Sequence, residues 1–354
     1  MNNLWVQSIL LILCSGMFYY VGYRLFSIFN AKLPIYILLV VSVILAIWCS
    51  FSIWYAWENT TLTVLWTFSA RIFVLWFLLF IFLWILHIIS IWYKINPWII
   101  LSVFAIILWV WVFFSLHTKI TNLNIQSDKI EKDTKILLVS DVHVDYIFSK
   151  FHLKKIENII KKERPDFVII AWDLINRPHS DYLKTYSMFK NDWYNIPIYA
   201  IIWNHDVLWD TSIIQNLPGI SSINLLNNES VIINWIQLVW IIDKSLWGNK
   251  DIDKILSESS MNKGSNLFTI LATHQPIWLE KLQDYPIDLE VAWHTHRGQF
   301  YWMREVARLM NDYAYWEYKY WEKTAFVTQW IWTWGLPFRL WTQSEMVVIN
   351  LTKK

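Results

Sequence analysis

Histidines, aspartates and one asparagine follow short apolar runs in the second half of the chain, with the residue types and spacings of a metal site. The clusters are Asp141-Val142-His143, Asp173, Asn204-His205-Asp206, His274 and His294-Thr295-His296. Carboxylate, imidazole and amide donors without cysteine suit a divalent ion such as Mn, Fe or Zn. Without Asp206, the five histidines with Asp141, Asp173 and Asn204 make eight donors, which are too many for one ion and about right for two. Two ions roughly 3.5–4 Å apart need a bridging carboxylate, and Asp173 is the natural candidate.

Tryptophan stands inside three of these clusters, at Trp172, Trp203 and Trp293, where the chain has to turn tightly and glycine fits best. The chain contains 27 Trp and only 7 Gly, whereas ordinary usage of about 7% would give roughly 25 Gly. We therefore hypothesise that UGA codons, which the host reads as Gly, have been translated as Trp. UGG codons at all three positions would exclude this hypothesis. The alternative is a genuinely Trp-rich membrane protein, because Trp is favoured at bilayer interfaces.

The distribution of charge divides the chain near residue 118. Before that point the charged side chains are Arg24, Lys32, Glu58, Arg71 and Lys94. Removing them from the totals of 30 Lys+Arg and 28 Asp+Glu leaves 26 and 27 for residues 119–354. A nearly neutral segment without a basic run argues against a nucleic-acid partner.

Residues 1–118 contain four apolar runs, each about long enough to cross a ~30 Å hydrocarbon core as a helix. They are Leu4–Tyr23, Pro34–Trp54, Ile72–Ile91 and Pro97–Leu116. The first run lacks a basic leading segment and is read as a retained span rather than a signal peptide. We expect a multi-pass integral membrane region of about four helices, with the lipid bilayer as a partner. Basic residues flanking the spans are too evenly divided to assign an orientation.

Residues 119–134 are polar and predict a linker, and residues 135–354 predict a globular domain. Three apolar runs, each just before a donor cluster, predict strands at Lys135–Ser140, Phe167–Ala171 and Ile198–Ile202. A helix is expected at Ser149–Glu163, ending before Pro165. Alternating strands and helices predict an α/β core, and ligands of such sheets gather outside the carboxyl ends of the strands. The donors are therefore placed where the chemistry needs them.

The later part of the domain is richer in strands and predicts a second sheet packed on the first. Its predicted strands are Val231–Asn234, Ile236–Asp243, Phe268–Thr273, Leu289–Ala292, Ala325–Gln329 and Glu345–Leu351. Both cysteines, Cys14 and Cys49, lie in apolar runs of the membrane region. The globular domain therefore has no disulfide framework and no thiolate metal site.

The ordered motifs resemble the calcineurin-like metallophosphoesterase family over about residues 135–351. They read Asp-x-His, Trp/Gly-Asp, Trp/Gly-Asn-His-Asp, Thr-His and Trp/Gly-His-Thr-His along the chain. The segment from Ile331 to Arg339 is similar to the Gly-Ile-Gly-Thr-Trp-Gly-x-Pro-x-Arg segment of the branch that hydrolyses membrane-associated substrates. The resemblance implies a four-layer α/β/β/α sandwich.

The resemblance also implies a role for each motif residue. A first metal would be bound by Asp141, His143 and His296, a second by Asn204, His274 and His294, and Asp173 would bridge the two. His205 would lie beside the phosphate and protonate the leaving oxygen or stabilise the transition state, with Asp206 orienting it. His152 and His179 fall outside the motifs and are read as structural histidines.

Tryptophan again occupies positions where the family has glycine. These positions are Trp172, Trp203, Trp293, Trp330 and Trp332, and Trp235, Trp240 and Trp341 are assigned with them. An indole there would carry a backbone cost wherever φ is positive and would crowd the metal pocket. Trp334 is a true family Trp, so its codon is expected to be UGG.

The sequence therefore predicts a membrane-anchored, dinuclear-metal-dependent phosphoesterase. Its substrate would be a phosphodiester or phosphomonoester, attacked by a metal-bridging water, and a lipid-linked ester would account for the spans. A second reading is a catalytically inactive membrane-tethered scaffold or binding module that keeps the fold, which the literal tryptophans would favour. A transporter with an appended domain is disfavoured because so little charge lies within the spans.

Overall fold

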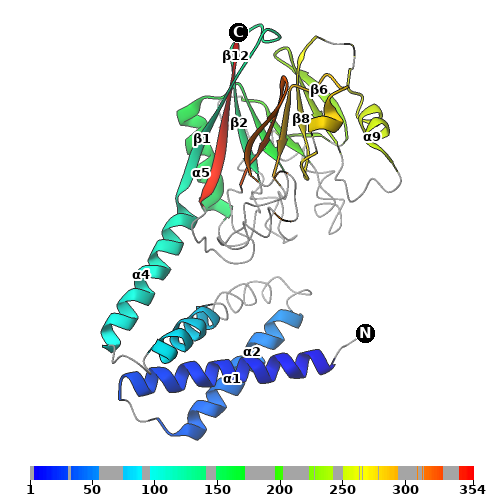
Figure 1. Cartoon of the computed structure of the whole chain (residues 1–354). Coiled ribbons are helices and arrows are strands. Elements are labelled where there is room, and N and C mark those ends of the chain that lie inside the picture. The colour runs from blue at the N-terminus through cyan, green and yellow to red at the C-terminus, as the bar shows by residue number, and fades with distance from the viewer. Residues whose placement is uncertain are drawn as a thin grey trace. The chain divides into compact units, whose positions relative to one another are not determined.

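The computed structural model divides the chain into two compact units, an N-terminal unit up to Phe113 and a second unit from Phe114 onward (Figure 1). The structure describes residues 4–30, 33–55, 75–89, 96–140, 149–171, 196–201, 223–226, 228–241, 250–262, 264, 266–277, 279–293, 309, 313, 315–329 and 343–354.

The N-terminal unit is built of apolar helices, and a helix is present in each of the four regions that the sequence predicted. They are α1 (Leu4–Ile28), α2 (Ile35–Tyr55), the helix Leu75–Ile89 and α4 (Pro97–Leu116). Within the described residues, one of them is long and apolar enough to cross a membrane, through its window Leu11–Ile28. Over those residues the other apolar stretches are shorter, so a four-span membrane region stays a prediction.

Aromatic contacts join the helices of this unit. The rings of Phe18 on α1 and Trp76 lie 5.5 Å apart in an edge-to-face arrangement, a geometry that aromatic pairs prefer. The Tyr20 hydroxyl lies 3.3 Å from Nδ1 of His87. Because His87 has this partner within the helical unit, we interpret it as a structural histidine rather than a metal ligand.

The second unit contains a first sheet with the strand order β1-β12-β2-β3-β4-β5. Its strands are β1 (Thr118–Ser127), β2 (Thr134–Ser140), β3 (Phe167–Ala171), β4 (Ile198–Ile201), β5 (Ile223–Leu226) and β12 (Ser344–Lys353). Strands β2 to β5 are parallel to one another, and β12 is antiparallel to β2. The three strands predicted before the first donor clusters are therefore neighbours in one parallel array.

Most of the segment predicted as a linker, residues 119–134, is instead strand β1, which pairs in parallel with β12. In this edge strand buried and exposed positions alternate, and Thr121 and Leu123 point into the protein. One face of an edge strand is exposed, so polar residues fill it without preventing sheet formation. Because the exposed positions of β1 are polar, the segment is polar on average and its composition resembles that of a linker.

A second sheet has the strand order β10-β11-β9-β8-β7-β6. Its strands are β6 (Ser230–Ile233), β7 (Ile236–Trp240), β8 (Phe268–Ala272), β9 (Leu289–Ala292), β10 (Trp316–Tyr320) and β11 (Lys323–Val327). Strands β7, β8, β9 and β11 are parallel, and β6 and β10 are antiparallel edges. The predicted second sheet is therefore confirmed, with two corrections. The predicted strand Glu345–Leu351 belongs to the first sheet as β12, and β10 was not predicted.

The two sheets pack face to face through one apolar core. On β2, Ile136 and Leu138 point into this core, while Leu137 and Val139 point to the other side of the sheet. Successive side chains of a strand point to opposite faces, so a strand made almost entirely of apolar residues is covered on both faces. The core also receives residues of β7, β8 and β9 from the second sheet.

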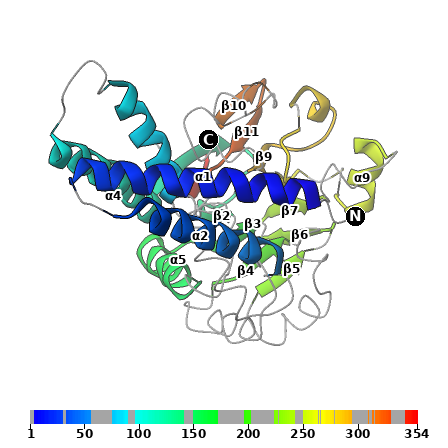
Figure 2. The same cartoon turned by 90° about the horizontal axis from the view of Figure 1, so that it is seen from below.

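Helices cover the two outer faces, as Figures 1 and 2 show. Helix α5 (Ser149–Glu163) places Leu153, Ile156 and Ile160 against the first sheet. It ends where Pro165 was expected to stop it, and Arg164, with φ 47°, leads the chain out. Helix α9 (Ile252–Glu258) and the 3₁₀ turn Leu279–Leu282 pack on the second sheet. The described elements thus follow the order α/β/β/α.

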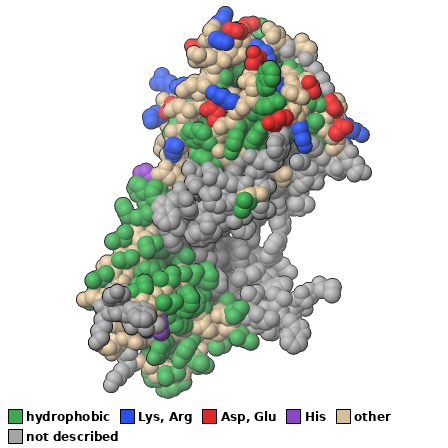
Figure 3. Space-filling view, viewed as in Figure 1, with side chains coloured by type: hydrophobic (Ala, Val, Ile, Leu, Met, Phe, Trp, Pro, Cys, Tyr) green, Lys and Arg blue, Asp and Glu red, His purple; other side chains and the backbone are tan. Residues whose placement is uncertain are grey.

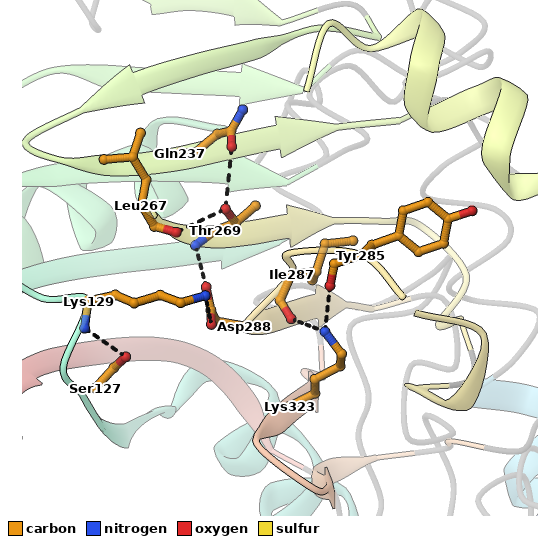
Figure 4. Close-up of polar contacts among 9 residues, drawn as sticks. All are labelled: Ser127, Lys129, Gln237, Leu267, Thr269, Tyr285, Ile287, Asp288 and Lys323. Atoms are coloured by element: carbon orange, nitrogen blue, oxygen red, sulfur yellow. Dashed lines mark hydrogen bonds and ion pairs between the residues drawn. The ribbon is translucent and has the colours of Figure 1, made fainter. Parts of the chain in front are cut away.

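A polar network joins the sheets near the amino end of β9 (Figure 4). The Lys129 ammonium, just after β1, lies 2.7 Å from Oδ1 of Asp288. The other carboxylate oxygen of Asp288 accepts the backbone N–H of Thr269 at 2.8 Å. Nearby, Lys323 donates to the carbonyls of Tyr285 and Ile287 at 2.6 and 2.9 Å. Asp288 is therefore bonded to both sheets at once.

Replacing the two partners of this ion pair should have unequal effects on stability. Asp288→Ala leaves the N–H of buried Thr269 without its acceptor, which costs about 1–3 kcal/mol. Lys129→Ala removes only a partly exposed ion pair, worth about 0.2–1 kcal/mol. Urea unfolding of both variants measures the difference, and equal losses would contradict the role given to the Thr269 bond.

Candidate metal centre

The carboxyl ends of three parallel strands lie in one row at the edge of the first sheet. Ser140 of β2 pairs with Ala171 of β3, and Ala171 pairs with Ile201 of β4. The sequence places Asp141 one residue after this row, Asp173 two residues after it and Asn204 three residues after it. This register brings the starts of the three donor segments to a single edge, as expected for ligands of a parallel sheet.

The second sheet brings two further donor segments together. Strand β8 ends at Ala272, which pairs with Val291 of β9. The backbone N–H of Trp293 donates to the carbonyl of His274 at 3.3 Å, so these two residues continue the pairing beyond the strands. His294 is the next residue of the chain. His274 and Trp293, the residue before the predicted ligand His294, therefore lie at the same level beyond adjacent parallel strands.

Buried Glu345 shows that the donor edges of the two sheets lie at the same end of the sandwich. Its place in β12, two residues before the Val347–Leu138 pair, sets it level with Ser140 at the end of β2. Its Oε2 accepts from the hydroxyl of Thr328 and the backbone N–H of Gln329, both at 3.1 Å. Thr328 follows β11 and donates its own N–H to Ala292 of β9 at 2.8 Å. One carboxylate thus spans both donor edges.

Two more hydroxyl groups complete the surroundings of Glu345. Thr121 of β1 and Tyr315 both donate to Oε1, the latter at 3.2 Å. A buried carboxylate is tolerated only when donors surround it, and Glu345 has four. Sequence reasoning missed this residue because its partners are far away along the chain.

His274 is the one predicted ligand that lies within the described residues. It is buried, and its ring lies 6.3 Å from the ring of Trp293 at 76°. The Trp293 indole in turn stacks on that of Trp240 at 6.3 Å and 16°, and both indoles are fully buried. The Trp293 ring therefore lies beside His274, and Trp240 contacts Trp293 in turn.

A buried acid, Glu290 of β9, accepts hydrogen bonds from residues on both sides of His274. Its Oε1 accepts from the Thr273 hydroxyl at 2.8 Å and from the Ile277 backbone N–H at 2.7 Å. Burial raises the pKa of Glu290 to about 8, although these two bonds act in the opposite direction. The single acid inside an apolar predicted strand, Leu289–Ala292, was the signal that could have revealed it.

The remaining predicted site residues lie outside the described part of the chain. They are Asp141, His143, Asp173, Asn204, His205, Asp206, His294 and His296. Among the residues that are described, no group of three or more His, Cys, Asp or Glu side chains is placed to hold a metal ion. The donor set itself, oxygen and imidazole nitrogen arriving at aligned strand ends, fits a divalent cation.

Comparison with known proteins identifies the family. A model of the calcineurin-like phosphoesterases matches residues 134–313, just over half of the chain. The chain belongs to this family. The resemblance of the ordered motifs to this family is thereby confirmed. Members of the family are metal-dependent hydrolases of phosphoric esters, and the two-sheet α/β fold described here is consistent with that membership.

Relatives of similar sequence carry the same domain. A metallophosphoesterase of Helicobacter pylori strain J99 is 26% identical over 239 residues, covering 67% of this chain and 64% of the relative. One from Campylobacter jejuni is 28% identical over 268 residues, covering 72% and 69%. A bovine transmembrane protein with a metallophosphoesterase domain is 26% identical over 239 residues, covering 61% and 52%. This chain therefore spans just under two thirds of the H. pylori relative.

The raised pKa of Glu290 predicts how stability changes with pH. The folded state keeps the proton up to about pH 8, whereas an unfolded carboxyl group releases it near 4.5. Stability from this group is fully present below the unfolded pKa and is lost as the pH rises through the folded pKa. Glu290→Gln, which cannot ionise, should therefore flatten the decline of the melting temperature between those two pH values.

Thermal unfolding of the detergent-solubilised chain across this pH range measures the effect. A matched control is Glu258→Gln, on the exposed end of α9, which should leave the slope unchanged. Parallel slopes for the parent and the Glu290→Gln variant would show that Glu290 is not protonated in the folded protein.

Proposed function

We propose that this chain is a membrane-anchored phosphoesterase that uses two divalent metal ions. The observation that carries the proposal is the row of aligned strand ends, Ser140, Ala171 and Ile201, from which the donor segments leave. His274 of the second sheet also supports the proposal. The hydrogen bonds of Glu345 place the donor edge of the second sheet at the same end of the sandwich as that of the first sheet. Family membership supports metal-dependent hydrolysis of a phosphoric ester.

The proposed ligand set divides between the two ions. The first ion would be held by Asp141, His143 and His296, the second by Asn204, His274 and His294, and Asp173 would be shared. When bound, Mn, Fe or Zn ions would polarise the phosphoryl oxygens and lower the pKa of a water molecule. Glu290 would keep the His274 segment in place through Thr273 and Ile277.

His205 is proposed to act on the substrate rather than on a metal. An imidazole titrates near neutral pH, so its protonated form can give a proton to the leaving oxygen. Asp206 would orient the ring. Both residues lie outside the described part of the chain, and their roles rest on the motif that contains them.

The N-terminal unit is proposed to be a membrane anchor. Hydrophobic side chains cover much of its visible surface, whereas Lys, Arg, Asp and Glu are seen on the second unit (Figure 3). Helix α4 ends at Leu116 and β1 begins at Thr118, so the catalytic unit directly follows an apolar helix. A phosphate ester carried by a lipid is the substrate class that best explains this continuity.

A specific observation favours a second candidate, an inactive scaffold or binding module with the same fold. The buried indole of Trp293 lies beside the His274 ring, and the buried indole of Trp240 stacks on Trp293. If the mature protein contains these indoles, they leave little room for a metal ion and a phosphate group beside that histidine.

Replacing His205 tests the enzymatic proposal. We expect His205→Ala to lower turnover by about 10²–10⁴-fold, the usual contribution of a general acid, and to leave the metal content unchanged. The assay is hydrolysis of a chromogenic bis-phosphodiester with added Mn, by a gene that encodes Gly at positions 172, 203 and 293. Elemental analysis gives the metal content.

A matched control is His152→Ala, because His152, on α5, does not belong to any of the motifs of the sequence. It should keep both turnover and metal. Loss of metal in His205→Ala would show that His205 is a ligand, and absence of hydrolysis in the parent chain would favour the scaffold.

The membrane anchor has its own test. The full-length chain should stay in the membrane fraction after an alkaline carbonate wash and be released by detergent, since apolar helices of this kind are stable only in an apolar environment. A peripheral membrane protein of the same host serves as the control for the wash. Release of the chain together with that control would contradict anchoring.

A further inference from the structure

Three tryptophans have a backbone conformation that tryptophan rarely adopts. Among the described non-glycine residues, positive φ angles occur at Asn30, Arg164, Asn228, Asn234, Trp235, Ser260, Trp316 and Trp321. Asparagine is enriched in this region, but for a bulky residue a positive φ is a genuine outlier. The left-handed conformation costs any residue with a Cβ atom, and glycine avoids that cost.

The hairpin between β6 and β7 shows most clearly what the backbone requires. Ile233 pairs with Ile236, which leaves a two-residue loop. The loop residues Asn234 and Trp235 have φ angles of 46° and 69°. Positive φ at both central positions defines a type I′ turn, for which Asn-Gly is strongly preferred. The Trp235 side chain is 59% exposed, so packing compensates little for the backbone cost.

The hairpin between β10 and β11 repeats the pattern. Tyr320 pairs with Lys323 across a two-residue loop, and the first loop residue, Trp321, has a φ of 55°. Its side chain is 91% exposed. At the start of β10, Trp316 has a φ of 85°. Neither Trp316 nor Trp321 belongs to a metal motif, so their geometry is independent of the proposed site.

The other two tryptophans that the structure describes in the second unit are the buried pair, Trp240 and Trp293. They stack on one another, and Trp293 contacts the ring of His274. Every tryptophan described beyond residue 117 therefore either has a backbone suited to glycine or belongs to the buried pair of which Trp293 contacts a predicted ligand.

We infer that the cell incorporates glycine at positions 235, 316 and 321, by reading UGA codons as Gly, and does the same at 240 and 293. The shortage of glycine, 7 residues against 27 Trp, agrees with such a reassignment. The inference for the three turn positions stands on backbone geometry alone. For 240 and 293 it rests on the proposed function, because glycine there would open the space beside His274.

The codons and the native protein decide the matter together. We expect UGA at all five positions and, in peptides from the protein isolated from its own host, glycine at each by mass spectrometry. Position 334 should have a UGG codon and tryptophan in the same sample. Tryptophan in native peptides at 235, 316 and 321 would overturn the inference.

The two parts of the inference fail separately. Glycine at 235, 316 and 321 with tryptophan at 240 and 293 would support reassignment at the turns and overturn the open pocket. Glycine at all five positions without hydrolysis by the native protein would leave the inference standing and refute the proposed function instead.

A folding experiment tests the backbone requirement without reference to the host. In the full chain, Trp321→Gly should give a higher melting temperature than Trp321→Ala, because both remove the indole and only glycine removes the Cβ atom. The matched control is Ile232 in β6, which is 56% exposed in an ordinary strand. There Ala should be better than Gly, since glycine weakens a strand interior. Ala equal to or better than Gly at 321 would contradict the requirement.

Discussion

The packing of two sheets through their inner faces is the constraint on which the rest of the second unit depends. Strands β2 and β3 are buried on both faces, so their backbone polar groups must pair within the sheet and their ends must line up. Each end of the sandwich is then held by an acid that bonds to both sheets, Asp288 at one end and Glu345 at the other. Apolar contacts are non-directional and do not by themselves fix how one sheet is placed on the other. The hydrogen bonds and the ion pair made by these acids have defined geometry and add that restriction. The aligned carboxyl edges, where the donor segments begin, follow from this arrangement.

Burying a carboxylate inside an apolar sandwich costs desolvation free energy. Glu345 and Glu290, the two buried acids at the donor edge, lie where they can restrict the movement of the segments that carry the predicted ligands. Glu345 has four donors around its two oxygens, so its desolvation is well compensated. Glu290 is compensated on one oxygen only, and its pKa rises accordingly. The Glu290 bonds hold Thr273 and Ile277 and thereby limit the positions open to His274. A site that depends on ligand geometry gains from such supports, because a small displacement of a ligand weakens both binding and catalysis.

Parts of the fold could be predicted to the residue, and the exceptions have physical causes. The bounds of β3, β9 and α5 agree with the sequence because apolar runs or a proline mark both ends. Strand β1 was missed because an edge strand alternates apolar with polar residues and resembles a linker. The motif order predicted the family, which the comparison confirms, and the donor set stays a prediction. His274 is buried and follows β8. Glu345 could not be foreseen, because Thr121 and Thr328 become its neighbours only when the sheets assemble.

The tryptophans separate the two candidate functions in a way that the metal motifs do not. An inactive scaffold would explain Trp240 and Trp293, because a protein without catalysis can fill its site with indole rings. It would not explain Trp235 and Trp321, since a scaffold needs its hairpins to close as much as an enzyme does. In natural sequences local preferences and the global fold usually agree, and here every described aromatic residue with a positive φ angle is a tryptophan. Glycine at these Trp positions would suit the backbone of the two hairpins and would also leave space beside His274. Because one substitution, glycine for tryptophan, accounts for both the hairpins and the site, we prefer the proposal of an enzyme to that of an inactive scaffold.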